Sequence, residues 1–299
     1  MMNISKTLNT RKVAIAALLL TAILWSTAGI AFRVLTTVTN GLAISGYRSF
    51  FAALFYIAVF RSFPKMENNK WFKIGILTYA IVTTLFVTAN TLTTAANAIV
   101  LQYTAPIFVC LYLFFIFKKP IPRYDIVATI IIFTGICIFF VDSLTLHASP
   151  AMTVGNTLAI VSGAAFGLIA IVLGQISKYQ NVLIFGNLLN VLIAIPFMIL
   201  NPIGSFLDLG VLIYLGFIQI GLSYLLFSFA ATKVSPLELI LISALEPILN
   251  PIWVFLFDGQ APSFLSLVGG VIIICTILVR SLYTEIRNKQ TEKTCDPIQ

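Results

Sequence analysis

The sequence predicts an all-α integral membrane protein whose ten transmembrane helices form two inverted five-helix repeats. Three observations support this prediction. Of the residues, 60% are hydrophobic and only 9% are charged, whereas soluble domains carry roughly 25% charged residues. Ten apolar segments are each long enough to cross a ~30 Å hydrocarbon core, which takes roughly 20 helical residues. The pattern of the first half of the chain also recurs 141 positions later.

The apolar segments are expected to be helices because the alternating ten-residue segments of a transmembrane barrel are absent. Lys6, Arg11 and Lys12 precede the first segment, and basic residues before an apolar run are also typical of a signal peptide. This segment continues for about twenty residues from Val13 and has many successors, so we interpret it as a retained span. The ten expected spans are residues 13–33, 42–60, 72–92, 96–117, 124–141, 154–174, 182–200, 209–231, 236–257 and 263–282.

If the N-terminus is cytoplasmic, nearly all basic residues lie on the cytoplasmic side of these spans. Of 18 lysines and arginines, only Arg33 and Arg48 lie outside the inward connections and the two termini. The positive-inside rule therefore predicts an N-in, C-in topology. The protein is expected to be a multi-pass protein of the lipid bilayer of a cell (inner or plasma) membrane. The same distribution accounts for the net charge of +8 without a nucleic-acid partner.

The clearest part of the repeat relates residues 95–117 to 236–258, in which Pro106 falls opposite Pro247. Hydropathy and the expected helix boundaries stay in step along the offset, although sequence identity is weak. We therefore expect a first repeat at 13–141, a second at 154–282 and a polar cytoplasmic tail at 283–299. Because five spans is an odd number, the second copy crosses the membrane in the opposite sense. Inverted repeats of this kind are typical of secondary transporters, which bind substrate between the halves near the midplane.

Several short motifs occur in a fixed order along the chain. They are LWSTAG at 24–29 followed by Arg33, YRSF at 47–50, Ala105-Pro106 in the fourth span and Glu246-Pro247 in the ninth. With these motifs the chain resembles the ten-helix drug/metabolite transporter (DMT) superfamily, and within it tandem EamA-type domain transporters, over roughly residues 13–282. The resemblance implies helices of two halves around a central cavity and export of a small metabolite, such as an amino acid or related compound. The turns at 118–120 and 258–260 depart from the Gly-Glu that the family often has there.

Two ionisable residues lie at membrane depth. Glu246 is about ten residues into its span, hence ~15 Å deep, and an ionisable group there is by default a functional-site hypothesis. It could titrate with proton movement or meet a cationic substrate group, or it could be a neutral carboxyl bonded to a neighbouring helix. Arg48 could bind a substrate anion, pair with Glu246, or extend ~10 Å toward the outer headgroups. Glu238 is instead interpreted as part of a capping box with Ser235.

Other candidates for substrate binding are polar or aromatic residues within the spans. Interhelical hydrogen bonds, worth only ~0.6 kcal/mol each, are the usual role of such polar groups, and aromatic residues near span ends are often interfacial anchors. The prolines within the fourth and ninth spans are candidates for gating, because they free backbone carbonyls. The substrate-binding candidates are Asn90, Gln219, Trp25, Tyr103, Asn250 and Trp253, with Gln102 and Tyr224 as further members of the polar and aromatic sets, and the gating candidates are Pro106, Pro247 and Pro251.

These features favour a secondary transporter that works by alternating access on a small-molecule substrate, with protons as a candidate coupling ion. No phosphate-binding GxxxxGK[ST] motif indicates ATP use, and scattered cysteines with one histidine predict neither a metal site nor a cofactor. The alternatives are a membrane-embedded lipid-modifying enzyme, for which His147 is the available residue, and a sensor or structural protein without transport. Gly163 and Gly167 fit packing inside the bundle or a dimer face, so a monomer or weak homodimer is expected.

Overall fold

The computed structural model describes residues 4–61, 64–141, 149–258 and 263–295. Within these residues ten helical segments are long and apolar enough to cross a membrane, which confirms the expected spans. The first half contains α1 (Ile4–Ser26), α2 (Ala28–Val34), α3 (Gly41–Phe60), α4 (Lys70–Leu92), α5 (Ala95–Gln102), α6 (Ala105–Leu111), the π-helix η1 (Tyr112–Ile116) and α7 (Arg123–Phe140). The second contains α8 (Pro150–Leu173), α9 (Tyr179–Leu200), α10 (Phe206–Tyr214), the π-helix η2 (Leu215–Leu222), α11 (Ser223–Ala231), α12 (Pro236–Ser243), α13 (Glu246–Asp258) and α14 (Phe264–Cys295).

Side-chain caps set where many of these helices begin. The hydroxyl of Thr94 accepts a hydrogen bond from the backbone of Asn97 at the start of α5, and Ser235 does the same for Glu238 at the start of α12. Such caps satisfy backbone N–H groups that have no partner inside the helix. The structure corrects the capping-box interpretation of Glu238, however. Its carboxylate turns away to the guanidinium of Arg11, because a buried carboxylate gains more from a cation than from one backbone N–H.

The repeat expected from the sequence is visible in the helix boundaries. Helix α5 ends at Gln102 and α6 begins at Ala105, while α12 ends at Ser243 and α13 begins at Glu246, 141 positions later in each case. The fourth and ninth spans are therefore broken at equivalent points. Each break comes just before a proline, whose ring and missing N–H are incompatible with a continuous helix. This agreement confirms the two five-helix repeats.

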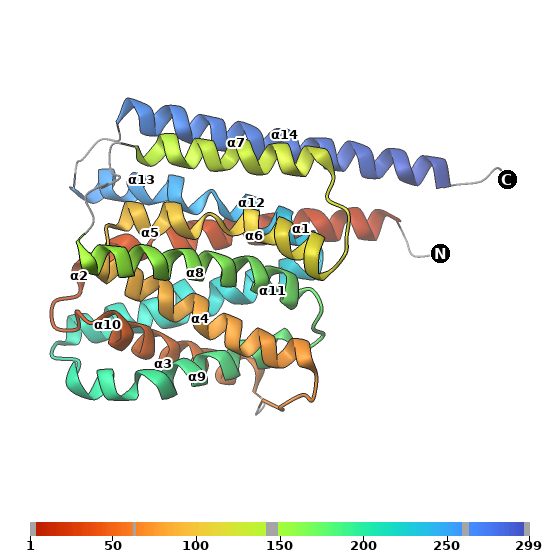
Figure 1. The fold of residues 1–299 in the computed structure, drawn as a ribbon. Helices are drawn as coiled ribbons and strands as arrows, with labels where there is room; N and C mark the ends of the chain where they lie inside the picture. The colour runs from red at the N-terminus through yellow and green to blue at the C-terminus, as the bar shows by residue number, and fades with distance from the viewer. Residues whose placement is uncertain (1–3, 62–63, 142–148, 259–262, 296–299) are drawn as a thin grey trace.

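Contacts between the halves follow the same two-fold relation. Helix α3 packs on α9 and α7 packs on α14, each helix against its own equivalent. Asn190 Nδ2 donates to Ser49 Oγ at 3.1 Å, and the two residues are 141 positions apart, so they lie at the axis. In Figure 1, α1 runs from the N-terminus toward the opposite end of the bundle, whereas its equivalent α8 runs back, as an inverted repeat requires.

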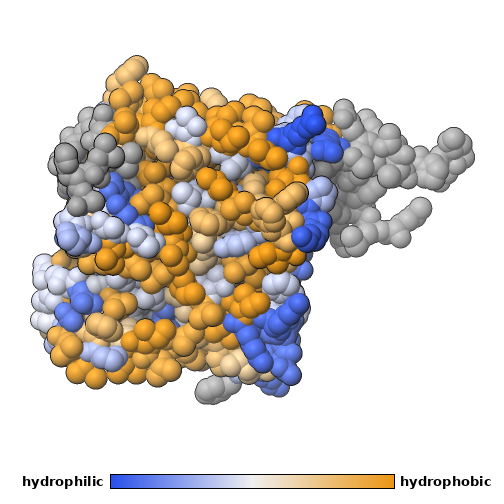
Figure 2. Space-filling view, viewed as in Figure 1, coloured by the Kyte–Doolittle hydropathy of each residue, from blue (hydrophilic) through white to orange (hydrophobic). Residues whose placement is uncertain are grey.

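The flank of the bundle is apolar and its polar residues gather at the ends (Figure 2). Exposed aliphatic side chains such as Leu192 and Val279, at 66% and 67%, suit contact with lipid. We call the end that carries Arg61, Lys119 and Lys233 the basic end; α1 begins there. At this end α14 continues to Cys295, so much of the expected polar tail extends the last helix.

Glycines in α8 allow the broken fourth span to approach closely. A Cβ atom at Gly163 would lie 2.6 Å from the carbonyl oxygen of Gln102, and one at Gly167 would lie 2.9 Å from that of Ala105. These distances leave no room for a side chain. The two glycines are therefore used for packing inside the chain, on both sides of the break between α5 and α6.

Candidate functional site

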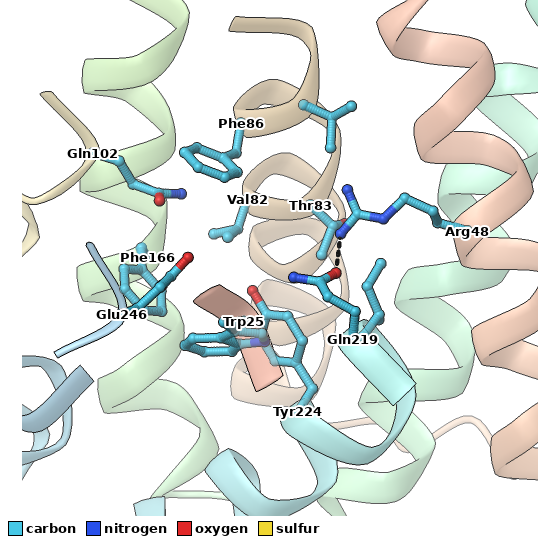
Figure 3. Close-up of a pocket in the computed structure, with 12 residues that line it drawn as sticks. Trp25, Arg48, Val82, Thr83, Phe86, Gln102, Phe166, Gln219, Tyr224 and Glu246 are labelled. Carbon is cyan, nitrogen blue, oxygen red and sulfur yellow. Dashed lines mark hydrogen bonds between the residues drawn. The ribbon is translucent and has the colours of Figure 1, made fainter. Parts of the chain in front are cut away.

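A small polar cavity lies between the two halves, near the middle of the bundle (Figure 3). The free volume open to the centre of a water molecule is ≈ 40 Å³. About 10–15 Å³ on this measure holds one water, and sites for small molecules are usually ~300–1,000 Å³. The cavity therefore has room for a few water molecules and is too small, in this arrangement, for a small-molecule substrate. Its lining comes from both halves and consists of Trp25, Arg48, Val82, Thr83, Phe86, Val87, Gln102, Phe166, Gln219, Ile220, Tyr224 and Glu246.

The break in the ninth span brings Glu246 to this cavity. Pro247 has no N–H, so the carbonyl oxygen of Ser243, four residues earlier, loses its helical partner. The hydroxyl of Tyr103 takes that place, with its oxygen 2.7 Å from the Ser243 oxygen. Tyr103 directly follows the last residue of α5 and so stands at the break in the fourth span. Its hydroxyl therefore satisfies the Ser243 carbonyl, which is freed at the equivalent break in the ninth span.

The same hydroxyl also contacts the carboxyl group of Glu246. Tyr103 Oη lies 2.9 Å from Glu246 Oε2. A tyrosine hydroxyl has one proton to donate, and a backbone carbonyl can only accept. Both contacts are hydrogen bonds at once only when Glu246 carries a proton and donates it to Tyr103. When Glu246 is ionised, the carboxylate and the Ser243 carbonyl compete for the single proton of Tyr103.

Arg48 lies across the cavity from Glu246, on α3 (Figure 3). It is 5% exposed, its Nη2 donates to Gln219 Oε1 at 2.5 Å, and its guanidinium carbon is 5.1 Å from the centre of the Phe32 ring. Its Nε and Nη1 are buried without a hydrogen-bond partner. Arg48 thus neither pairs with Glu246 nor extends to the headgroups. Two donors of a buried cation remain free, an arrangement that suits an incoming oxyanion.

An aromatic cluster forms another wall of the cavity. The ring of Trp25 lies 5.8 Å from that of Phe166 and 5.0 Å from that of Tyr224, between ring centres. Phe166 in turn stacks on Phe227 at 5.7 Å. These separations are in the range of favourable aromatic pairs. The cavity therefore combines a cation, a carboxyl group and an apolar aromatic surface.

Four of the expected binding residues line the cavity: Trp25, Arg48, Gln219 and Glu246. Tyr103 is not among the lining residues, but its hydroxyl contacts Glu246, which is. The expected gating prolines Pro106 and Pro247 each follow a helix break, and Pro251 lies within α13, its side chain being outside the described residues.

Three expected binding residues lie elsewhere. Asn90 donates to the carbonyl of Phe86 in its own helix. Asn250 packs against Gly29 of α2, where a Cβ would come within 2.7 Å of its side-chain oxygen. Trp253 Nε1 donates to Ser26 Oγ at 2.8 Å and faces a separate apolar groove on the flank of the bundle. His147, on which a lipid-modifying enzyme would depend, lies outside the described residues.

Several lining residues carry no signal that sequence reasoning could use. Thr83, Phe86 and Phe166 lie on helices whose outward and inward faces are both apolar, so hydropathy does not tell which face meets the cavity. Gln102 and Tyr224 stand out by their polar atoms, but only the fold shows that both face the same space.

Comparison with known proteins gives a family match, a relative by sequence and relatives by structure, of which one is described below. The EamA-like transporter family matches the chain twice, at residues 12–141 and 153–282. A relative from Archaeoglobus fulgidus, described as an uncharacterized transporter, is 25% identical over 276 residues, which cover 87% of this chain and 94% of the relative. A crystal structure of a protein superposes with a TM-score of 0.75 at 16% identity, covering 90% of this chain and 96% of that one. This last likeness concerns the fold alone.

Proposed function

The chain belongs to the EamA-like transporter family, and we propose that it is a secondary transporter that exports a small metabolite, an amino acid or a related compound, by alternating access. The observation that carries the proposal is the small polar cavity between inverted halves, with Arg48 and Glu246 on opposite walls. Binding at the meeting point of two inverted repeats, beside broken helices, is the usual arrangement in such transporters.

Each wall of the cavity has a role in binding. The free Nε and Nη1 of Arg48 bind an anionic group of the substrate, and Gln219 holds the guanidinium in place. An apolar or ring-bearing part packs against Trp25 and Phe166. Glu246 receives either a cationic group of the substrate or a proton. Because the cavity has room for only a few waters, it must widen before a substrate binds.

Protons are the coupling ion in this proposal, and Glu246 is their binding site. With a proton on Glu246, Tyr103 donates to the Ser243 carbonyl and the two helix breaks are joined. Without it, the ionised carboxylate attracts the Tyr103 proton more strongly than a neutral carbonyl does. The Ser243 carbonyl is then left without a donor in a buried place, which disfavours the closed arrangement. The broken helices with Pro106 and Pro247 are the elements that move.

The remaining parts of the proposal concern placement. The basic end faces the cytoplasm, so both termini are cytoplasmic, by the positive-inside rule. The protein lies in the cell membrane as a monomer or weak homodimer. Gly163 and Gly167, the dimer-face candidates, are occupied by contacts within the chain, which supports the monomer.

Two experiments in sequence test the function. First, thermal stability of purified protein is measured with amino acids, nucleosides, amines and carboxylates, because a ligand of the native state raises stability by ~2.7 kcal/mol at 100 times its Kd. Second, each stabilising compound is loaded into proteoliposomes. Saturable flux of the unchanged compound supports transport. Chemical conversion of the compound or of the lipid would instead support an enzyme, and binding without flux would support a sensor.

A further inference from the structure

Four charged side chains form a buried chain of ion pairs near the basic end, away from the central cavity. Arg11 Nη2 lies 2.5 Å from Glu238 Oε1, the same oxygen is 3.5 Å from Arg280 Nη1, and Arg280 Nε lies 2.9 Å from Asp125 Oδ1. The side chains are 4–13% exposed. Charges this far out of water are retained only with partners.

The chain of ion pairs ties the two halves together. Arg11 belongs to α1 and Asp125 to α7, both in the first half, whereas Glu238 belongs to α12 and Arg280 to α14 in the second. Two of the three pairs therefore cross between halves that alternating access must move relative to each other. The middle pair joins them within the second half, so the four side chains form one connected unit.

The four charged residues also line a second cavity. Its volume is ≈ 610 Å³, it lies at the basic end, and Lys119 and Lys233 line it too. One face of α8 connects this cavity to the central one: Phe166 lines the central cavity, Gly174 lines the basic-end cavity, and Ala170 lies between them, fully buried. The four charges thus line the basic-end cavity, and buried residues such as Ala170 separate this cavity from the central one.

A second contact joins the two halves at the other end. Asp208, at the start of α10, is fully buried and accepts hydrogen bonds from the backbone N–H and hydroxyl groups of both Thr36 and Thr37. These threonines precede α3 in the first half. The two halves are therefore joined at both ends, by ion pairs at one end and by hydrogen bonds to one carboxylate at the other.

Ion pairs suit a contact that must open to water. An apolar contact that opens exposes surface that water solvates poorly. A buried ion pair that opens exchanges its partner for water, which solvates both charges, so the closed and open arrangements differ little in free energy. Arg280 Nη1 has no hydrogen bond beyond its ion pair with Glu238, so only a few contacts need to be broken.

We propose that Arg11, Glu238, Arg280 and Asp125 form the gate at the basic end of the transport path. The ion pairs are made when this end is closed and are broken when it opens. The contact of Asp208 with Thr36 and Thr37 holds the opposite end closed meanwhile. The gate needs no particular substrate, so its test does not depend on identifying one.

The test measures how fast a buried reporter cysteine is labelled. All four native cysteines are replaced, and Ala170→Cys is introduced between the central and basic-end cavities. Purified full-length protein in detergent is treated with a polar maleimide. We expect Glu238→Gln and Asp125→Asn each to raise the labelling rate of Ala170→Cys at least about tenfold, since an open state populated at 0.1–10% leaves room for that increase.

Two controls separate a gate from general loosening. Ala43→Cys reports on the opposite end, where Ala43 is fully buried near Leu212, and its labelling should stay unchanged in both gate variants. Asp208→Asn should do the reverse, raising labelling at Ala43→Cys only. The conservative variant Asp125→Glu keeps the negative charge beside Arg280 and should leave labelling at Ala170→Cys near the starting rate.

The result has clear ways to contradict the proposal. Unchanged labelling of Ala170→Cys in both gate variants, or an equal increase at Ala43→Cys, overturns it. If the single variants do not fold, Arg280→Lys is used, because lysine keeps the charge but reaches only one of the two carboxylates; unchanged labelling in this variant overturns the proposal too. Labelling that follows the ion pairs while no compound is transported would keep the gate and remove the proposed function.

Discussion

Tyr103 and Glu246 meet where two equivalent helices are broken, with Tyr103 Oη 2.9 Å from Glu246 Oε2. The first residue stands at the break in the fourth span and the second begins the helix after the break in the ninth. A proton on Glu246 therefore decides whether Tyr103 is hydrogen-bonded to both partners at the ninth-span break or to only one of them. The protonation of one carboxyl group thus changes the hydrogen bonding between the two broken helices.

Glu246→Gln should abolish proton-dependent transport while the protein still folds and inserts. Glutamine keeps the size of the side chain but cannot exchange a proton. Flux of a compound found in the stability screen would be measured in proteoliposomes over a range of pH values, with and without a pH gradient. Glu67→Gln, the same change in a loop outside the cavity, is the control and should transport normally. Equal transport by Glu246→Gln and the parent at every pH would remove Glu246 from the mechanism.

Tyr103→Phe should lower stability by about 1–3 kcal/mol, because the Ser243 carbonyl would be buried without a donor. The ring and its packing are kept, so the loss reports on the hydroxyl. The same variant should also weaken the response of transport to pH. Thermal unfolding in detergent measures the first effect. Tyr214→Phe, which removes a half-buried hydroxyl bonded to Thr27, is the matched control, and an equal or larger loss there would speak against a special role for Tyr103.

Gln219→Glu should lower the affinity for ligands with a carboxylate by at least about tenfold, equivalent to ~1.4 kcal/mol. The new carboxylate would lie beside Arg48 and occupy the donors that an incoming anion needs. Ligands without an anionic group should bind as before. Affinity is measured by calorimetry on purified protein. Gln175→Glu, the same change at an exposed turn near the basic end, should leave both classes of ligand unaffected; a uniform loss for both classes in Gln219→Glu would indicate simple disruption of the cavity.

Gly163→Ala should lower the stability of the protein, whereas Gly210→Ala should raise it. At Gly163 the added methyl group meets the Gln102 carbonyl at 2.6 Å, and overpacking of this kind costs typically ~1–3 kcal/mol. At Gly210 no atom lies within 4 Å, so the helix-favouring effect of alanine, up to ~1 kcal/mol, remains. Thermal unfolding of the two variants side by side tests the close approach of α8 to the break in the fourth span. Equal stability of the two variants would mean that α8 and the Gln102 carbonyl lie far enough apart to admit a methyl group at Gly163.

The sequence predicted the ten spans and the repeat because both depend on apolar length and on proline, which are properties of single segments. Arg48 and Glu246 were also found, since an ionisable group at membrane depth stands out against its neighbours. Phe166 and Thr83 were not, because a helix in lipid can be apolar on its inward and outward faces alike. Only packing decides which face lines the cavity.

The ion-pair chain was missed for a different reason. Arg280 had a sufficient explanation as a topology signal at a span end, and Glu238 had one as a helix cap. Because each residue had a sufficient local explanation, neither Arg280 nor Glu238 indicated an ion pair with a residue far away in the sequence. Asp125 lies in the first turn of α7, where acidic residues are common because they interact favourably with the helix dipole, so its sequence position does not indicate an ion pair.

The pairing of α7 with α14 has the same geometry at its two ends but not the same chemistry. Arg280 reaches Asp125 at the basic end, while the equivalent positions at the other end are Phe139 and Ser266, where the serine hydroxyl donates to a backbone carbonyl at 2.8 Å. Two identical halves would give an empty carrier with no preferred orientation. Divergence of the two copies at these positions gives the molecule a sidedness, because an ion pair joins α7 to α14 at the basic end and an uncharged hydrogen bond joins them at the other end.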